Sequence, residues 1–344
     1  ERGYRVYLYP ADVKGRFRRL RTYCYSILML IFLVMPWIRL NGQQAILLDV
    51  AKRRFSIFGV TFWAHDAPMV FFLISGVALA LVFITALWGR AWCGWACPQT
   101  VFIDVIFRRI ERFVEGDPLT RRALDAQKWS DTWIFKKIIK WALFIFASLI
   151  VAHSFLAYFV GTEELAKMMV QSPTENWTSF LVMSFVTALI AFDFGWFREQ
   201  FCVIMCPYGR LQSLITDENS VSVVYDERRG EPRATGKKSL SEVDTRQKAG
   251  DCINCYRCVR VCPTGVDIRR GTQLECIACS ACVDVCDEVM TYNKKPKGLI
   301  RYDSSRGLAG QPTHLIRART VIYAALLIAL SVSFAFVLSH RKLL

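Results

Sequence analysis

The sequence predicts an all-α membrane protein with a small cysteine-rich domain inserted before the last membrane span. Three observations support this fold class. Hydrophobic residues make up 53% of the 344 residues and the mean hydropathy is +0.28, which is too apolar for an ordinary soluble domain. Five apolar runs each have about 20 residues, the length needed to cross a bilayer core. Eight of the 13 cysteines lie between residues 252 and 286.

The five apolar runs are predicted to be transmembrane helices in contact with membrane lipid. Trp and Arg flank several of them, as is common at membrane interfaces. A buried core helix would explain any one run, but it is a poor explanation for five. The predicted spans are residues 21–40, 68–88, 138–160, 177–197 and 319–339.

The net charge of +15 follows the positive-inside pattern and does not indicate nucleic acid. If the N-terminus is cytoplasmic, the segments on that side carry seven, seven and twenty Lys or Arg residues in 1–21, 89–135 and 198–319. The opposite side carries far fewer, although the cluster Lys52, Arg53 and Arg54 runs weakly against the pattern. We therefore expect a cytoplasmic N-terminus and an extracytoplasmic C-terminus.

These features divide the chain into segments along its length. A cytoplasmic N-terminal segment is expected first, then a four-helix membrane core, a linker, the cysteine-rich domain with its connector, and a fifth span. The predicted bounds are 1–20, 21–215, 216–250, 251–318 and 319–344. Because the chain stops soon after the fifth span, we expect an extracytoplasmic part beyond Leu344 to be missing.

The cysteine-rich domain carries the pattern C-x2-C-x2-C-x3-C twice, in CINCYRCVRVC and CIACSACVDVC. Short C-x2-C steps let one tight loop supply three thiolates to a [4Fe–4S] cluster, and in two-cluster ferredoxins the fourth cysteine of each run ligates the other cluster. Zinc or disulfides are disfavoured by the doubled spacing on the reducing side of a membrane. Cluster I is predicted to use Cys252, Cys255, Cys258 and Cys286, and cluster II to use Cys262, Cys276, Cys279 and Cys282.

A bacterial-ferredoxin-like 2[4Fe–4S] domain of this kind moves single electrons. All eight ligand positions are filled, which leaves no room at the clusters for substrate chemistry. No G-x-G-x-x-G motif follows a predicted strand, so a nicotinamide donor is not indicated. The electron donor is expected to be another protein or a quinol.

Two further cysteine pairs follow the second and fourth spans in WCGWACPQT and FCVIMCPYG. Their cysteines and prolines repeat with an offset of 109 residues, which predicts two duplicated helical hairpins that each end in C-x3-C-P. If each helix continues, the two thiols of a pair share one face. Four gathered thiolates would suit Cu(I), zinc or another iron–sulfur centre, and a redox disulfide or simple packing is the alternative. The cysteines are Cys93, Cys97, Cys202 and Cys206.

Isolated polar residues near the spans are weaker candidates. Imidazole suits copper and haem iron, and three histidines are predicted near the extracytoplasmic face: His65, His153 and His340. A haem is a candidate that no second feature supports. Asp193, inside the fourth span, is either a packing residue or a proton or cation site. Asp104 is weaker still, and Cys24 is expected to be a packing thiol.

The segments WGRAWCGWACPQTVF, CPYGRLQS and CINCYRCVRVCPTGVDIR resemble the FixG/RdxA/CcoG family of cytochrome c oxidase accessory proteins, and the similarity covers essentially the whole chain. The resemblance implies a bacterial inner-membrane protein that reduces Cu(II) to Cu(I) for assembly of a cbb3-type oxidase. Copper ions, oxidase assembly factors and copper chaperones are the implied partners. It also implies a periplasmic immunoglobulin-like domain after the fifth span.

Two other functions stay open at this point. Quinol dehydrogenases of the NapH/NosR class also combine C-x3-C-P motifs with ferredoxin quartets and pass electrons to a periplasmic partner. The fifth span after the ferredoxin domain favours the first family. An oxidase assembly scaffold with redox-inert clusters is the third reading, and the sequence leaves open whether the chain forms a homodimer.

Overall fold

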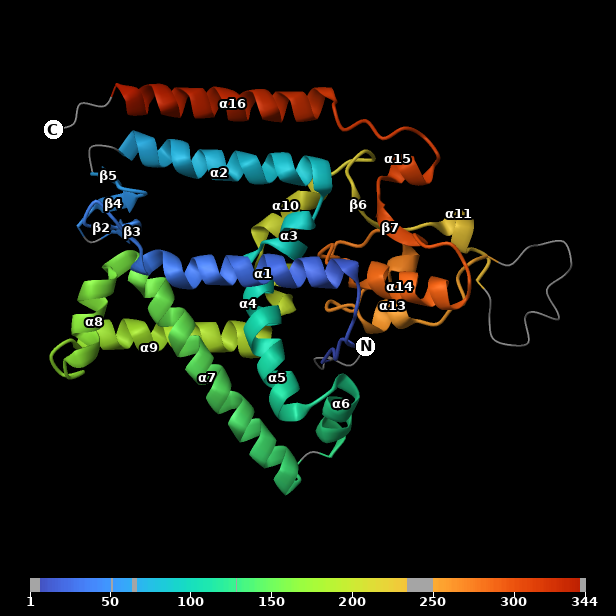
Figure 1. The fold of residues 1–344 in the computed structure, drawn as a ribbon, viewed down its shortest axis with the longest axis horizontal. Helices are drawn as coiled ribbons and strands as arrows, with labels where there is room; N and C mark the ends of the chain where they lie inside the picture. Colours follow the sequence, from blue (N-terminus) through green and yellow to red (C-terminus); the bar gives the residue numbers. More distant parts are fainter. Residues whose placement is uncertain (1–6, 51, 64–66, 128, 234–249, 341–344) are drawn as a thin grey trace, which may run out of the picture.

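The computed structural model describes residues 7–50, 52–63, 67–127, 129–233 and 250–340. It combines a bundle of long apolar helices with a cysteine-rich domain that packs on one end of the bundle (Figure 1). Figure 1 places this domain at the right, together with the N-terminal end of the chain. The last helix ends on the left, at the opposite end of the bundle.

Within the part of the chain that the structure describes, five helices are long and apolar enough to cross a membrane, which confirms the five predicted spans. The first and third begin earlier than expected, because their charged N-terminal turns are already helical. Short non-α turns extend the first and fourth, namely η1 (Met35–Trp37) and η4 (Asp193–Phe197). The five helices are α1 (Arg16–Val34), α2 (Ala67–Trp88), α7 (Asp131–Val160), α9 (Trp177–Phe192) and α16 (Ala318–Ser339).

The packing of these helices differs in part from the expected duplicated hairpins. Helix α7 packs along α9, as expected for spans three and four. Helix α2, however, packs along α16, where Gly76 lies opposite Leu330. Helix α1 contacts the cysteine-rich domain through α14 (Ala281–Tyr292). Spans one and two, the helices of the first predicted hairpin, therefore do not form a main helix pair, because α2 packs on α16 instead.

Short helices follow each of the even-numbered spans. After α2 come α3 (Ala91–Trp95) and α4 (Pro98–Phe102), and the chain then continues through η3 (Ile103–Phe107) into α5 and α6. After α9 come η5 (Phe201–Met205) and α10 (Pro207–Ile215). Figure 1 draws α3 and α10 beside the cysteine-rich domain, and α5 and α6 below it. The bounds of the remaining two are Arg108–Glu115 for α5 and Pro118–Ala126 for α6.

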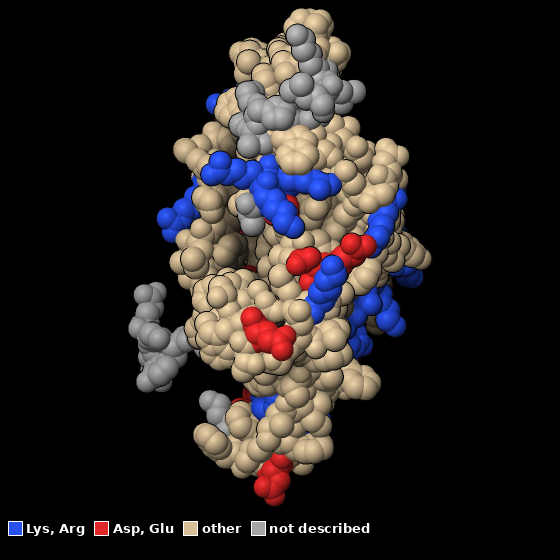
Figure 2. Space-filling view, turned by 90° about the vertical axis from the view of Figure 1, so that its left-hand side faces the viewer, with Lys and Arg blue, Asp and Glu red and all other residues tan. Residues whose placement is uncertain are grey.

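Small antiparallel sheets occupy the opposite end of the bundle, which the all-α expectation did not include. Strands β1 and β2 form one pair, and β3, β4 and β5 form a three-stranded sheet in that order. The strands are too short for a clear alternating pattern to show in the sequence. Their bounds are Arg39–Leu40, Gln43–Gln44, Ile46–Asp49, Arg54–Ile57 and Val60–Phe62. Helix α8 (Thr162–Val170) lies at the same end, which faces the viewer in Figure 2, where basic side chains gather in the upper half.

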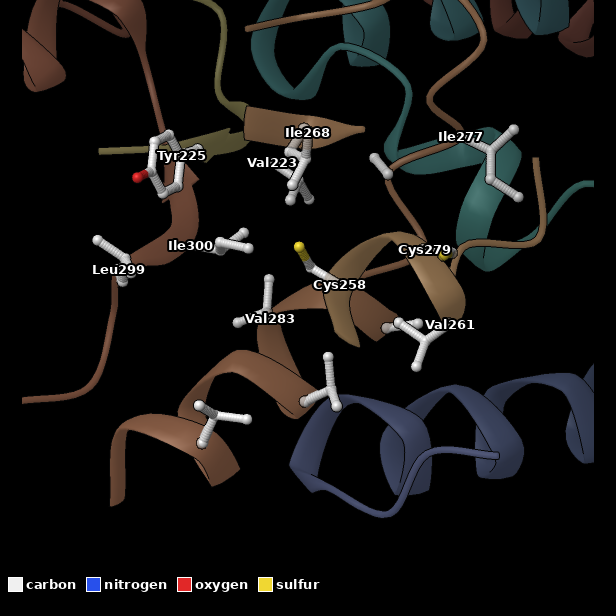
Figure 3. Close-up of a cluster of buried hydrophobic side chains, with 14 of the residues drawn as sticks. Val223, Tyr225, Cys258, Val261, Ile268, Ile277, Cys279, Val283, Leu299 and Ile300 are labelled. Carbon is white, nitrogen blue, oxygen red and sulfur yellow. The ribbon is translucent and has the colours of Figure 1, made fainter. Parts of the chain in front are cut away.

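The cysteine-rich domain begins before its predicted boundary at residue 251. Strand β6 (Ser222–Tyr225) pairs antiparallel with β7 (Ile300–Asp303), so part of the predicted linker 216–250 belongs to the domain. Val223, Ile300 and Val283 form its core around Cys258 (Figure 3). Hydrophobic burial of the strand pair explains why this segment folds with the domain. The other elements are α11 (Glu227–Gly230), α13 (Arg257–Arg260), η6 (Ile268–Arg270) and α15 (Ser305–Leu308).

Candidate functional site

The two C-x2-C-x2-C loops of the cysteine-rich domain share one backbone conformation. Asn254 and Tyr256 in the first loop have positive φ angles of 53° and 57°, and Ala278 and Ser280 in the second have 52° and 62°. These residues hold equivalent places between the cysteines. Positive φ is uncommon for residues other than glycine, so its repetition shows that both loops are bent in the same way around their thiols.

The eight cysteines of these loops gather around two small cavities. One cavity is lined by the first predicted set, Cys252, Cys255, Cys258 and Cys286. The other is lined by the second predicted set, Cys262, Cys276, Cys279 and Cys282, with Cys258 at its edge. In each case the fourth thiol comes from the other quartet, which is the crossed arrangement that two adjacent clusters require.

The chemistry of these thiols fits [4Fe–4S] clusters. Among the residues that the structure describes, no three His, Cys, Asp or Glu side chains lie close enough to hold a single metal ion, whereas a cubane holds its thiolates further apart. Burial raises the pKa of Cys276 and of Cys286 to about 12, so their thiolates need a cationic partner. The backbone N–H of Val266 also donates to the Cys262 sulfur at 3.3 Å.

The C-x3-C-P motifs are not continuous helices, which corrects one sequence expectation. Cys93 lies in α3, but Cys97 has extended backbone and precedes α4. Cys206 has the same extended backbone before α10. Pro98 and Pro207 each occupy the first position of a new helix, a position in which their missing N–H costs nothing. Both prolines therefore lie at the start of a helix.

The four thiols of these motifs lie close enough for their charges to interact. Burial, and then Cys97, raise the pKa of Cys93 to about 11. Burial, followed by the other three thiols, raises the pKa of Cys202 to about 12. Cys93 is buried, and the other three are partly exposed. The thiols share one region, but three of them do not converge tightly enough for a mononuclear site.

The first motif rests directly on the loop between two cysteines of the second quartet. Gly94 lies against the backbone of this loop, and a β-carbon there would come within 2.9 Å of the Ala278 carbonyl oxygen and closer still to that of Ile277. Trp95 Nε1 donates to Tyr302 Oη at 3.0 Å, and Tyr302 Oη donates to the Ala278 carbonyl at 2.9 Å. Cys93 belongs to the core of the cysteine-rich domain, and Figure 3 shows Ile277 and Cys279 on the side of that core nearest the α3 segment.

Polar groups hold the Cys93 region in place. The Nε2 of Gln212, which is buried in α10, donates to the Cys93 sulfur at 3.6 Å. The Thr100 hydroxyl donates to the Cys93 carbonyl at 2.8 Å. Arg90 donates to the Gly209 carbonyl in the second motif. Gln212 and Arg90 could not be singled out from the sequence, because nothing in a lone glutamine or arginine marks a contact 119 residues away.

The weaker candidates gain little from the structure. His65 lies outside the described residues. His153 Nδ1 donates to the Leu149 carbonyl of its own helix at 2.8 Å. His340 is exposed, with its ring at 3.0 Å from the Phe336 carbonyl. Asp193 accepts from Gln99 Nε2 at 3.0 Å, which places it beside the first motif.

Asp104 and Cys24 both have structural partners. Asp104 is buried between Arg18 at 2.5 Å, Arg21 at 3.4 Å and Arg108 at 3.5 Å. Cys24 donates weakly to the Trp95 carbonyl at 3.4 Å, so it supports the first motif from α1. Asp104 therefore has a larger structural role than the sequence suggested.

Comparison with known proteins gives a consistent picture. Residues 197–305 match a family model described as a 4Fe-4S dicluster domain, and residues 69–116 match one described as a 4Fe-4S binding domain. RdxA of Cereibacter sphaeroides is 35% identical over 338 residues, covering 94% of this chain and 70% of RdxA. RdxB of the same organism is 39% identical over 334 residues, covering 93% and 69%. The nitrogen fixation protein FixG of Rhizobium meliloti is 38% identical over 306 residues, covering 86% and 56%. No solved structure matches the chain.

Proposed function

Because the chain belongs to the family that includes RdxA, RdxB and FixG, we propose that it reduces Cu(II) to Cu(I) at its C-x3-C-P thiols for the assembly of a cbb3-type oxidase. The general function, electron transfer in a membrane, follows directly from the comparisons. The two 4Fe-4S family matches and the five apolar helices make this a multi-pass membrane iron–sulfur electron-transfer protein. The reduction of Cu(II) to Cu(I) is our proposal.

One observation carries the proposal, namely the contact of Gly94 with the 277–278 backbone. Cys93 and Cys97 lie on either side of Gly94 along the chain, and Cys276 and Cys279 lie on either side of the contacted peptide. No side chain separates the two backbones there. The thiol motif is thus held at the edge of the second quartet, and the first quartet lies beyond it.

When bound, two [4Fe–4S] clusters would supply one-electron transfer, with the eight cysteines of the two quartets as the proposed ligands. Cu(II) takes up one electron and becomes Cu(I). A reduced protein would supply single electrons, whereas a quinol would supply two electrons, release two protons and balance two copper ions. The electron donor stays open between these two.

The C-x3-C-P thiols are suited to the product of this reaction. Soft thiolates select Cu(I), so binding the product more tightly than the substrate raises the driving force for reduction. Because three thiols do not converge on one point, we propose that Cu(I) is held by two of the four. Each binding thiol loses its proton, since only the thiolate is a metal ligand.

The proposed location follows from the charge distribution. The end that carries the cysteine-rich domain is rich in Lys and Arg, which favours a cytoplasmic position for it and for the N-terminus in a bacterial inner membrane. The end of α16 would then be periplasmic. Copper chaperones and oxidase assembly factors are the proposed partners.

The test uses the purified full chain, reduced anaerobically and mixed with Cu(II). Replacing Cys93, Cys97, Cys202 and Cys206 by Ser should abolish copper binding and cupric reduction while the iron content stays unchanged. Cys24→Ser, which keeps a donor for the Trp95 carbonyl, is the matched control and should behave as the parent. Parent-like reduction by the quadruple variant would overturn the proposal.

Loss of iron from the quadruple variant would identify a third cluster in place of copper. One observation favours that second candidate, because the family match at residues 69–116 is described as 4Fe-4S binding and spans Cys93 and Cys97. Iron analysis alone separates the two cases, with about eight irons expected for two clusters.

A further inference from the structure

A buried arginine lies beside each of the two cysteine sets of the cysteine-rich domain. Arg269 is buried and lines the cavity of the first set. Arg21, in α1, is also buried, and its Nη1 donates to the carbonyl of Cys279 in the second set at 2.8 Å. The proposed copper chemistry uses neither guanidinium. The first set, for cluster I, is Cys252, Cys255, Cys258 and Cys286, and the second, for cluster II, is Cys262, Cys276, Cys279 and Cys282.

The charge of Arg269 is balanced inside the domain. Its Nε and Nη2 donate to the two carboxylate oxygens of Asp267, each at 2.8 Å. Its Nη1 donates to the side-chain oxygen of Asn254 at 2.6 Å. One carboxylate therefore faces one guanidinium in a bidentate pair, and this pair brings no net charge to the first set.

The charge of Arg21 is balanced only in part. Its contact with Asp104, at 3.4 Å, is longer than its hydrogen bond to the cluster loop. Asp104 also contacts Arg18 at 2.5 Å and Arg108 at 3.5 Å, and Arg108 pairs with Glu199. Within the described part of the chain, these five groups comprise three positive and two negative charges. One positive charge therefore remains beside the second set.

Two further charges act in the same direction. Burial raises the pKa of Cys276, in the second set, and of Cys286, in the first set, to about 12. The charge of Arg90 opposes this rise at Cys276, whereas the charge of Asp287 adds to it at Cys286. Asp284, two residues from a cysteine of each set, accepts from the backbone N–H groups at the start of α1 and favours neither set. The surroundings of the second set are therefore the more positive.

A positive charge near an iron–sulfur cluster raises its reduction potential, because reduction adds one negative charge to the cluster. The effect is largest for a buried charge, since the protein interior screens it weakly. We propose that Arg21 raises the reduction potential of cluster II above that of cluster I. An electron that enters the domain then settles on the cluster whose loop contacts the thiol motif at Gly94. Arg21 is thus a positioning residue that acts through the cluster.

The first test measures the order of the two potentials in the parent. The purified full chain is titrated with dithionite in the absence of copper, and the reduced clusters are followed by electron paramagnetic resonance at each potential. The signal that appears first should be the one that Cys255→Ser retains, because Cys255 belongs to the first set. The reverse order would overturn the proposal.

Two variants of Arg21 separate its charge from its hydrogen bond. Arg21→Gln keeps a donor but removes the charge, and it should lower the equilibrium constant for reduction of cluster II about tenfold, which is about 59 mV for one electron. Arg21→Lys keeps the charge and should restore the parent potential. Arg19→Gln, the same charge change at an exposed position of α1, is the matched control and should leave both potentials unchanged, because solvent screens it. An equal shift of both clusters, or equal shifts in the Gln and Lys variants, would refute the role of the charge.

A third variant changes the charge beside Arg21 without touching that residue. Asp104→Asn removes a carboxylate that offsets the guanidinium, so it should raise the potential of cluster II. An unchanged or lowered potential would count against the proposal even if Arg21→Gln lost its iron. These potentials are measured without copper, so a failure of the proposed cupric reduction would leave them unaffected. A reversed order of potentials together with parent-like cupric reduction would overturn this inference alone.

Discussion

Arg21, in the first membrane helix, donates a buried hydrogen bond of 2.8 Å to the carbonyl of Cys279 in the second quartet. The same guanidinium contacts Asp104 at 3.4 Å. One side chain therefore connects α1, the segment after the first C-x3-C-P motif and a cluster loop. A buried arginine is costly unless it is paired, so these contacts depend on one another.

Arg21→Met is expected to destabilise the junction between membrane core and cysteine-rich domain. It removes the donor to Cys279 and one of the three arginine partners of buried Asp104, and a hydrogen bond to a charged group typically contributes about 1.5–3 kcal/mol. Thermal unfolding followed by tryptophan fluorescence would measure it. The exposed Arg19→Met is the control on the same helix, and an equal loss in both variants would contradict the assigned role.

Asp104 should make the folded protein sensitive to acid. Burial opposes its charge, but Arg21, Arg18 and Arg108 hold the pKa of its carboxyl below the ordinary value of 3.8. A lowered folded pKa means that the stabilisation is complete above the unfolded pKa and is lost as the pH falls through the folded pKa. Asp104→Asn should therefore lower the unfolding temperature clearly at pH 7 and progressively less below about pH 4. Glu164→Gln, on the exposed part of α8, should show no such pH-dependent difference.

Gly94→Ala should separate the first motif from the cluster loop. The new β-carbon would meet backbone rather than a movable side chain, and overpacking of this kind costs about 1–3 kcal/mol. Cupric reduction should slow at least tenfold while iron content stays at the parent value. Gly76→Ala is the matched control, because its β-carbon would meet only Leu330 at an ordinary 3.7 Å. Parent-like reduction in the Gly94 variant would show that the contact is dispensable.

Single cysteine substitutions should affect the two cavities differently. Cys255 lines one cavity and Cys279 the other, so Cys255→Ser and Cys279→Ser should each remove one cluster and leave about four irons. Iron analysis and electron paramagnetic resonance of the reduced protein measure this. Cys24→Ser should keep about eight irons. Zinc in place of iron after anaerobic purification would refute the cluster assignment.

Orientation in the membrane can be tested with inserted tags. Tags after Val50 and after Glu175, at the end opposite the cysteine-rich domain, should be reached from the periplasm. A tag at residue 240 should be reached only after the membrane is opened. Cytoplasmic labelling at Val50 would show that Lys52, Arg53 and Arg54 report the orientation, and the proposed topology would be wrong.

Much of the local structure could be predicted from residue patterns. The five spans are visible because about 20 apolar residues in a row have few other stable environments. The crossed cysteine sets could be predicted because two runs of C-x2-C-x2-C-x3-C are the pattern of two-cluster ferredoxins, in which the fourth cysteine of each run ligates the other cluster. Extended strands such as β3 were missed because two to four residues give no readable alternation, and β6 was assigned to a linker because its partner β7 lies about 75 residues further along the chain.

What the sequence by itself determined is therefore the set of elements whose signal is local: the apolar helices and the cysteine loops. The tertiary structure decided which elements meet. Apolar helices look alike in sequence, so the pairing of α2 with α16 could not be read from it. The contact of Gly94 with the 277–278 peptide joins segments more than 180 residues apart. Such contacts depend on shape and charge in three dimensions, which no local pattern in one sequence records.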